Sequence, residues 1–234
     1  MIMTPHLHPH QEKHFQGSEM LSDIVIGMSD GLTVPFALAA GVSQAGVSNY
    51  VIVTAVIAEI VAGSIAMGLG GYLAGQTERE HYFNELKREY DEVKNVPERE
   101  KQEIKEILSK YNISESVQNQ LVEELSKNED KWVEFMMQFE LGLSEPDIDR
   151  AKKSAFNIGL SYIAGGLVPL IPYLLTDNPH QGFIGSVILT VIALLIFGYI
   201  KSKTTGQHPL KGSLKTTLVG LLAAFAAYFV AKLF

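Results

Sequence analysis

The stretch YVIVTAVIAEIVAGSIAMGLGGYLAG, residues 50–75, decides the fold, because it is apolar over more than the ~20 helical residues that cross a bilayer core. It continues directly into QTEREHYFNELKREYDEVK, residues 76–94, which is rich in charged side chains. No proline lies between Pro35 and Pro97, so no residue in this stretch lacks the backbone donor that a helix needs. The sequence therefore predicts one helix over residues 50–94 that crosses a membrane and then enters water.

Four further stretches are long and apolar enough to be membrane spans, at residues 21–43, 154–176, 182–200 and 214–233. Prolines within the span at 154–176 are tolerated when neighbouring helices satisfy the freed backbone groups. Residues 1–20 are polar and lack the apolar segment of a signal peptide, so the first span is expected to remain in the mature protein. Together these patterns predict an all-α integral membrane protein with five transmembrane helices.

A polar block interrupts the apolar chain at residues 76–150. It holds 20 of the 26 acidic and 11 of the 19 basic residues, so its net charge is −9 and that of the remainder is +2, which argues against a nucleic-acid binder. Without cysteine, disulfides and thiolate metal sites are excluded. We expect a helical domain inserted between the second and third spans. The predicted parts are a polar tail (residues 1–20), spans 1 and 2 (21–75), the acidic domain (76–150) and spans 3 to 5 (151–234).

The distribution of basic residues predicts the orientation, because Lys and Arg accumulate on the cytoplasmic side. With the N-terminus in the cytoplasm, 18 of the 19 basic residues lie inside and only Lys232 lies outside. The connections at residues 44–49 and 177–181 contain no Lys or Arg. We therefore expect a cytoplasmic N-terminus, a cytoplasmic acidic domain and a C-terminus on the opposite side.

Candidate metal ligands recur at regular spacing in the acidic domain. It contains two pairs of glutamates three residues apart, each able to direct both carboxylates at one ion, and a later glutamate beside two methionines. Facing helices that carry carboxylates build metal sites in helical bundles, and a thioether favours later transition metals. The alternative is a solvated surface with ordinary glutamate–lysine pairs. The predicted ligands of a divalent metal are Glu89, Glu92, Glu100, Glu103, Met136, Met137 and Glu140.

Acidic residues also occur inside the predicted spans, although an acid at the bilayer centre costs roughly 2.5–3.5 kcal/mol. Asp23 and Asp30 are seven residues apart and share one face of the first span, whereas Glu59 lies in the second span with Met67 beyond it. Asp23 near the interface can simply begin the helix, and the deeper acids can be hydrogen-bonded or protonated packing residues. The other interpretation is a cation path, lined by Asp30, Glu59 and Met67, whose carboxylates also carry protons.

Several longer motifs resemble the vacuolar iron transporter family, also called the yeast calcium-sensitivity-complementing type. They are DIVIGMSDGLTVPFALAAG at residues 23–41, Glu59 followed by SIAMGLGGYL at 64–73, FMMQFELGL at 135–143 and GGLVPLIP at 165–172. The resemblance covers nearly the whole chain.

The resemblance implies a five-span homodimer, embedded in membrane lipids, whose translocation path lies at the dimer interface and is lined by the first two spans. It implies export of Fe(II) from the cytoplasm in exchange for protons, into a vacuole or across a bacterial inner membrane, with no organic cofactor. Manganese, cobalt, nickel and zinc ions are further candidate substrates. The positions that match the family's path are Asp23, Asp30, Glu59 and Met67. Those that match its cytoplasmic metal-binding domain are Glu89, Glu92, Glu100, Glu103, Met136, Met137 and Glu140.

Two other functional classes remain open. One is a membrane-anchored protein that binds or oxidises iron without transport, and the other is a metal-dependent sensor or scaffold whose spans are anchors. Neither class uses acids inside the spans, so we favour an antiporter and not an enzyme. The N-terminal histidines are interpreted as part of a disordered tail, with metal capture as the alternative; they are His6, His8, His10 and His14.

Overall fold

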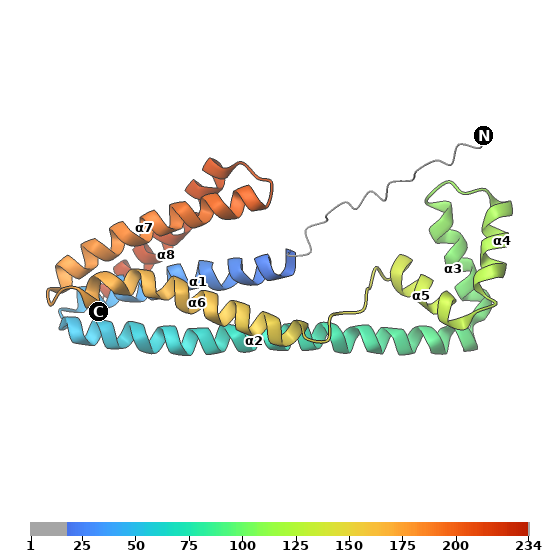
Figure 1. Cartoon of the computed structure of the whole chain (residues 1–234), viewed down its shortest axis with the longest axis horizontal. Helices are drawn as coiled ribbons and strands as arrows, with labels where there is room; N and C mark the ends of the chain where they lie inside the picture. Colours follow the sequence, from blue (N-terminus) through green and yellow to red (C-terminus); the bar gives the residue numbers. More distant parts are fainter. Residues whose placement is uncertain (1–17, 234) are drawn as a thin grey trace, which may run out of the picture. The chain divides into compact units, whose positions relative to one another are not determined.

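The computed structural model describes residues 18–233, which form helices and no strand (Figure 1). They belong to two compact units: unit 1 falls within residues 1–71 and 153–234, and unit 2 is residues 72–152. The helices in chain order are α1 (Ser18–Val42), the 3-10 turn η1 (Ser43–Ala45), α2 (Asn49–Asn95), α3 (Pro97–Ser109), α4 (Glu115–Leu125), α5 (Glu129–Phe139), α6 (Arg150–Leu174), α7 (Pro179–Thr204) and α8 (Pro209–Ala231).

Five helices, α1, α2, α6, α7 and α8, are long and apolar enough to cross a membrane. The prediction of an all-α chain with five candidate spans is thus confirmed. α7 and α8 begin earlier than hydropathy predicts, because capping residues start a helix whatever its polarity. Pro179 and Pro209 occupy first-turn positions, and the side chain of Asn178 accepts hydrogen bonds from the first backbone donors of α7.

The predicted polar tail at residues 1–20 lies outside the described residues, apart from residues 18–20, which belong to α1. Its four histidines, His6, His8, His10 and His14, also lie outside the described residues.

Helices of unit 1 approach one another at glycines. Gly27 and Gly31 of α1 lie against the backbone carbonyls of Ile158 and Tyr162 in α6, so closely that a Cβ at either glycine would overlap the carbonyl. Gly165 of α6 meets the backbone of α1 in return. Because lipid tails are as apolar as leucine, such close van der Waals packing, and not apolar burial, drives the association of helices in a membrane.

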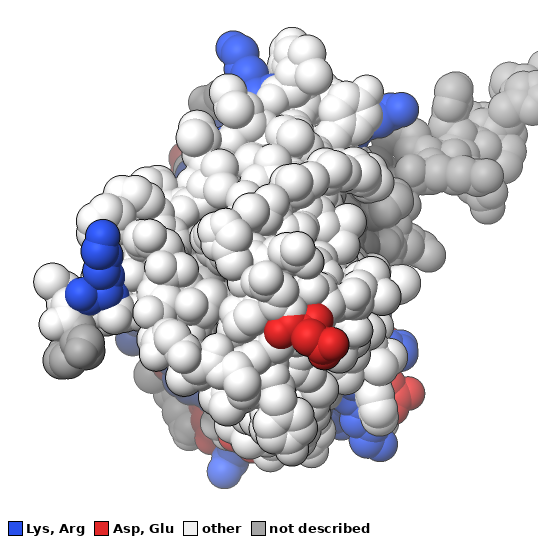
Figure 2. Space-filling view, turned by 90° about the vertical axis from the view of Figure 1, so that its left-hand side faces the viewer, with Lys and Arg blue, Asp and Glu red and all other residues white. Residues whose placement is uncertain are grey.

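Polar side chains tie the α1–α2 connection to the end of α6. The amide of Asn49 donates to the carbonyls of Tyr173 and Thr176 at 2.7 and 2.8 Å. The hydroxyls of Ser43 and Tyr173 are hydrogen-bonded at 2.7 Å. This end of unit 1 faces the viewer in Figure 2, where most of the surface is uncharged. In the two connections, residues 46–48 and 175–178, the only charged residue is Asp177.

Unit 2 has an apolar core of its own, and four helices contribute to it. Its buried members are Val93, Ile104, Leu108, Val122, Trp132, Val133, Met136 and Met137. Tyr82, Leu86 and Tyr90 of α2 pack against this core, as the helical periodicity predicts. Phe83, which periodicity places on the same face, is instead 40% exposed and stacks under the Arg79 guanidinium at 5.2 Å. Tyr82 and Phe83 are 100° apart on the helix, so only one of them points to the core centre.

The glycine contacts of α1 predict the effect of single added methyl groups. Gly31→Ala should destabilise the protein by about 1–3 kcal/mol, because its Cβ meets a backbone carbonyl that cannot move aside. Gly41→Ala in the same helix is the control: its nearest neighbour is the Ala227 carbonyl oxygen at an ordinary 3.4 Å. Thermal unfolding of both variants in detergent checks this, and equal midpoints would contradict the packing argument.

Candidate functional site

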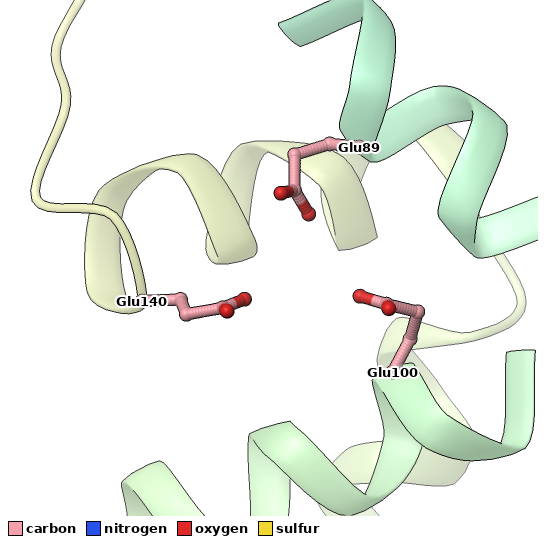
Figure 3. Close-up of side chains that lie close together, drawn as sticks. All are labelled: Glu89, Glu100 and Glu140. Carbon is pink, nitrogen blue, oxygen red and sulfur yellow. The ribbon is translucent and has the colours of Figure 1, made fainter. Parts of the chain in front are cut away.

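Three glutamates of unit 2 form a cluster that can hold a metal ion. Glu89 of α2, Glu100 of α3 and Glu140 at the end of α5 place one carboxylate oxygen each within 4.8 Å of one another. Figure 3 shows the three carboxylates pointing towards a common centre. Glu89 and Glu100 are each only 1% exposed, whereas Glu140 is exposed. The arrangement can offer a cation two buried carboxylates and one exposed carboxylate.

Local sequence positions each of these carboxylates. A single residue, Val96, separates the end of α2 from Pro97 at the start of α3, so the first turn of α3 follows directly on the last turn of α2. Glu100 lies in that first turn, and Glu89 lies one helical turn before the buried Val93. Glu140 caps α5, and Gly142, with φ of 66°, allows the chain to leave the helix there.

The electrostatics of the cluster favour the binding of a proton or a cation. Burial first, and then repulsion from Glu140, Glu100 and Glu92, raises the pKa of Glu89 to about 7. Burial, followed by repulsion from Glu103, Glu92 and Glu140, likewise raises the pKa of Glu100 to about 7. The pKa of Glu140 is raised as well, first because neighbouring atoms displace water from its carboxylate although the residue as a whole is exposed, and then by repulsion from Glu103 and Glu92. Because Oε2 of Glu89 and of Glu100 is buried and accepts no hydrogen bond from a described residue, the pair needs a proton or a cation.

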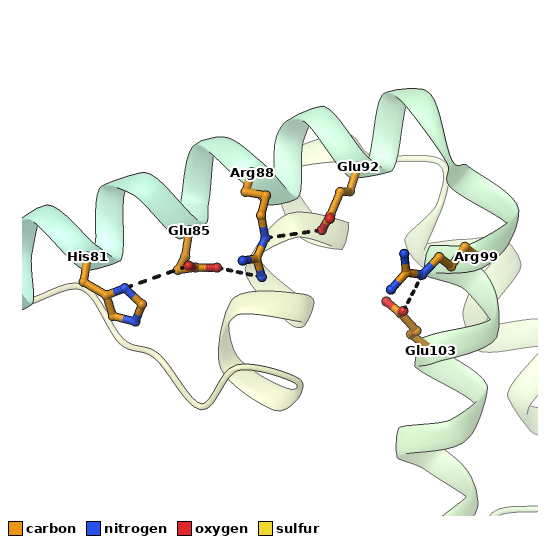
Figure 4. Close-up of polar contacts among 6 residues, drawn as sticks. All are labelled: His81, Glu85, Arg88, Glu92, Arg99 and Glu103. Carbon is orange, nitrogen blue, oxygen red and sulfur yellow. Dashed lines mark hydrogen bonds and ion pairs between the residues drawn. The ribbon is translucent and has the colours of Figure 1, made fainter.

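The other two predicted glutamate ligands lie at the edge of the cluster and are held by arginines (Figure 4). Glu92 is 3.7 Å from Arg88, which also pairs with Glu85 at 2.7 Å. Glu103 accepts a hydrogen bond from Arg99 at 3.0 Å. The charges of Glu92 and Glu103 still act on the three central carboxylates, as the raised pKa of Glu100 reflects. They are therefore close enough to contribute to one electrostatic site.

The predicted sulfur ligands lie in the apolar core of unit 2. Met136 is 0% and Met137 3% exposed, both on α5 just before Glu140. Met137 also lines a separate cavity with Tyr82 and Tyr90. A thioether ligand from either methionine stays a prediction.

Two acids of the spans are hydrogen-bonded to α6. Asp23 is 2% exposed and accepts hydrogen bonds from the Ser154 hydroxyl at 3.0 Å and the Asn157 amide at 3.4 Å. Oε1 of Glu59 accepts a short hydrogen bond from the Tyr162 hydroxyl, while its buried Oε2 has no described partner. Asp23 thus lies deep in the packing between α1 and α6, away from water.

Tyr162 is a residue that the sequence reasoning missed. Its ring lies against Gly63, where a Cβ would overlap it, and its backbone lies against Gly31, the neighbour of Asp30. Tyr162 therefore connects the turn of α1 that carries Asp30 with the turn of α2 that carries Glu59. The signal in the sequence was a tyrosine in the middle of an apolar span, where its hydroxyl needs a partner.

The remaining path candidates are half-buried in unit 1. Asp30 lines a cavity between α1, α7 and α8, and no hydrogen bond of its carboxylate with a described residue is found. Met67 lies on α2 two turns beyond Glu59. Among the described residues, Glu89, Glu100 and Glu140 of unit 2 are the only group of three or more His, Cys, Asp or Glu side chains close enough to hold a metal ion. A site formed by Asp30, Glu59 and Met67 stays a prediction.

The sequence is similar to known proteins over almost its whole length. The VIT family matches residues 21–232. Vacuolar iron transporter 1 of Tulipa gesneriana is 51% identical over 226 residues, which cover 97% of this chain and 92% of that protein. Vacuolar iron transporter 1 of Arabidopsis thaliana is 49% identical over 223 residues, 95% and 89% of the two chains. Protein CCC1 of Saccharomyces cerevisiae is 39% identical over 222 residues, 92% and 69% of the two chains.

The raised pKa values predict that metal-free unit 2 loses stability as pH rises. In the unfolded chain Glu89 and Glu100 release their protons near pH 4.5, but in the folded protein only near pH 7. The contribution of these two protonated carboxyl groups to the free energy of unfolding is thus fully present below pH 4.5 and is lost as pH rises through about 7. Fluorescence of Trp132, the only tryptophan and buried in unit 2, can follow thermal unfolding in the presence of a chelator.

The control for this prediction separates the cluster from the other carboxylates. Glu100→Gln should flatten the decrease between pH 4.5 and 7, because an amide does not titrate, whereas the same change at the exposed Glu106 should leave it intact. A midpoint temperature of unfolding that rises between pH 4.5 and 7 in the parent chain would show that Glu89 and Glu100 are not protonated as we infer.

Metal titration tests the cluster directly. Glu100→Ala combined with Glu103→Ala should weaken divalent-metal binding to unit 2 about tenfold or more, because one buried ligand and one neighbouring charge are removed. Anaerobic calorimetry with Fe(II) measures the affinity. Glu98→Ala with Glu106→Ala removes the same charge from exposed positions of α3 and should leave the affinity unchanged. Equal weakening in both double variants would show that the affinity depends on the net charge of α3 and not on the cluster.

Proposed function

The chain belongs to the VIT family, and from that premise we propose that it is a multi-pass membrane transporter that exports Fe(II) from the cytoplasm, into a vacuole or out of the cell, in exchange for protons. Manganese, cobalt, nickel and zinc ions are further candidate substrates, and we propose no organic cofactor and no nucleic-acid partner. The observation that carries the proposal is the combination of a buried carboxylate cluster in unit 2 with acids inside the spans of unit 1.

We assign unit 2 the role of a cytoplasmic ion collector. Its three central carboxylates, assisted by Glu92 and Glu103, attract divalent cations and concentrate them near the membrane. The orientation of the transporter follows from charge: the connections at the end of unit 1 shown in Figure 2 contain no basic residue, whereas the α7–α8 region carries four lysines. This asymmetry supports our proposal that the N-terminus and unit 2 are cytoplasmic.

The proposed translocation path runs between two copies of the chain along α1 and α2. In support, the membrane part of α2 leaves a stripe of apolar and small residues uncovered, among them Ala58, Ala62, Ile65, Ala66 and Leu69. Small residues allow helices of two protomers to approach closely. Glu59 and Met67 belong to the same part of α2, and together with Asp30 of α1 they are the proposed ligands of the ion in transit, with Asp23 nearer the cytoplasmic end.

Proton exchange is proposed to use the same acids. A carboxylate away from water is stable when protonated or when paired with a cation, so binding of Fe(II) displaces protons and reprotonation releases the ion. The buried Oε2 of Glu59, without a described partner, is available for either state, while Tyr162 holds the other oxygen in place.

Flux into proteoliposomes tests the transport proposal. An imposed pH gradient should drive uptake of Fe(II), and Asp30→Ala or Met67→Ala should abolish it because a ligand of the path is lost. Asp177→Ala, in the α6–α7 connection, removes an acid outside the proposed path and should retain the parent rate. Undiminished flux in both path variants would refute the assigned path. If the parent protein instead consumes oxygen with Fe(II) and moves no ion, the alternative of a membrane-anchored iron oxidase is correct.

A further inference from the structure

An exposed connection in unit 2 has no role in the proposed transport. It comprises residues 141–149, between the end of α5 and the start of α6, and forms no helix or strand (Figure 1). From residue 144 to residue 149 it is exposed, apart from the half-buried Pro146. No backbone–backbone hydrogen bond with a described residue involves residues 144–146. This part of the chain is therefore open to a protein that binds an extended segment.

The connection is also strongly acidic. Residues 132–149 contain five acidic residues and no basic one. Two of the acids follow Ser144 closely, Glu145 at the next position and Asp147 at the third. Pro146 between them favours an extended backbone at Glu145. The segment thus presents one hydroxyl and two carboxylates in an extended chain, which is complementary to the basic substrate groove of an enzyme that selects its targets by charge.

Two other hydroxyl-bearing residues of unit 2 have an acid three positions later, but both are held by helices. Thr77 of α2 donates a hydrogen bond to the carbonyl of Leu73 at 2.8 Å. Ser126 at the end of α4 donates to the carbonyl of Glu123 at 3.1 Å. The Ser144 hydroxyl, in contrast, forms no hydrogen bond with a described residue. Of the three, Ser144 is the hydroxyl that an enzyme can reach without unfolding a helix.

We propose that Ser144 is a phosphorylation site for an acidophilic Ser/Thr protein kinase, with ATP as the phosphoryl donor. In the reaction, Oγ of Ser144 forms a bond to the γ-phosphorus of ATP, and the bond from that phosphorus to the bridging oxygen breaks. ADP leaves, and the hydroxyl proton passes to the catalytic carboxylate of the kinase. ATP is available in the cytoplasm, which is where the proposed orientation of the transporter puts unit 2.

The phosphate acts on the glutamate cluster through its charge, which is about −1.5 to −2 at pH 7. Ser144 is four residues after Glu140, so their Cα atoms are at most ~14 Å apart. Ser144 also borders a cavity whose wall contains three acids and, among the described residues, no base that would neutralise a phosphate. At ~0.1 M salt the added charge should raise the affinity of the cluster for a divalent cation about two- to threefold. This effect rests on the proposed role of the cluster as an ion collector, whereas the phosphorylation itself does not.

Treatment of the full-length protein in detergent with casein kinase 2 and MgATP tests the site. Casein kinase 2 serves as the acidophilic probe, and mass spectrometry of the peptides locates the phosphate. The parent chain should carry phosphate on Ser144, and Ser144→Ala should lose it. Ser126→Ala removes a hydroxyl with a similar acid spacing from a helix end and should leave phosphorylation of Ser144 at the parent level. Absence of phosphate from Ser144 in the parent chain would overturn the proposal.

A second pair of variants tests recognition by the neighbouring acids. Glu145→Gln with Asp147→Asn should slow phosphorylation of Ser144 about tenfold or more, because two charge-assisted contacts with the kinase are lost. Glu98→Gln with Glu106→Gln removes the same charge from exposed positions of α3 and should leave the rate unchanged. An unchanged rate in the first variant would overturn the assigned recognition.

Anaerobic calorimetry with Fe(II) tests the effect on the cluster. The phosphorylated parent should bind about two- to threefold more tightly than the untreated parent at ~0.1 M salt, and the difference should vanish at ~1 M salt. Kinase treatment of Ser144→Ala should leave the affinity unchanged. Equal affinity before and after phosphorylation of the parent would overturn the effect. Untreated protein that binds no Fe(II) would refute the collector, and with it this effect, but not the phosphorylation site. Because no step involves a pH gradient or flux, failure here would leave the transport proposal unaffected.

Discussion

A carboxylate that is removed from water must be given a proton, a hydrogen-bond donor or a cation, and the arrangement of this chain depends on how each buried acid meets that requirement. In unit 1 the partners are provided by α6: Ser154 and Asn157 for Asp23, and Tyr162 for Glu59. In unit 2 the buried Oε2 atoms of Glu89 and Glu100 accept no hydrogen bond from a described residue, and burial with repulsion from neighbouring acids outweighs the attraction of Arg88 and Arg99. In the first arrangement only Oε2 of Glu59 is left without a described partner, and in the second two buried oxygens remain that a proton or a cation can neutralise.

Glycine makes the first arrangement geometrically attainable. A hydroxyl of α6 can reach an acid of α1 or α2 only if the helices approach closely, and Gly27, Gly31 and Gly63 remove the side chains that would prevent it. The same residues therefore serve packing and polar chemistry. A larger residue at Gly63 would displace the tyrosine ring that holds Glu59, so its effect on the acid would be indirect.

Hydropathy and the spacing of prolines were sufficient to predict the five long helices and the continuous helix α2, because these features are local in sequence. The cluster of Glu89, Glu100 and Glu140 could be predicted only in part from the sequence. Spacing of i and i+3 pairs Glu89 with Glu92 and Glu100 with Glu103, but the ends of three helices decide which member of each pair turns inward. Periodicity likewise could not decide between Tyr82 and Phe83, and no local pattern indicated that Tyr162, 103 residues away, would bind Glu59.

The arginine pairs beside the glutamate cluster affect the affinity that the cluster can have for a metal ion. Glu92 and Glu103 are already paired with Arg88 and Arg99, so a metal ion must compete with a guanidinium for their carboxylate oxygens. In the ion collector that we propose, this competition weakens the contribution of Glu92 and Glu103 to binding. The proposed site therefore binds a divalent ion less tightly than the same carboxylates would without the arginines.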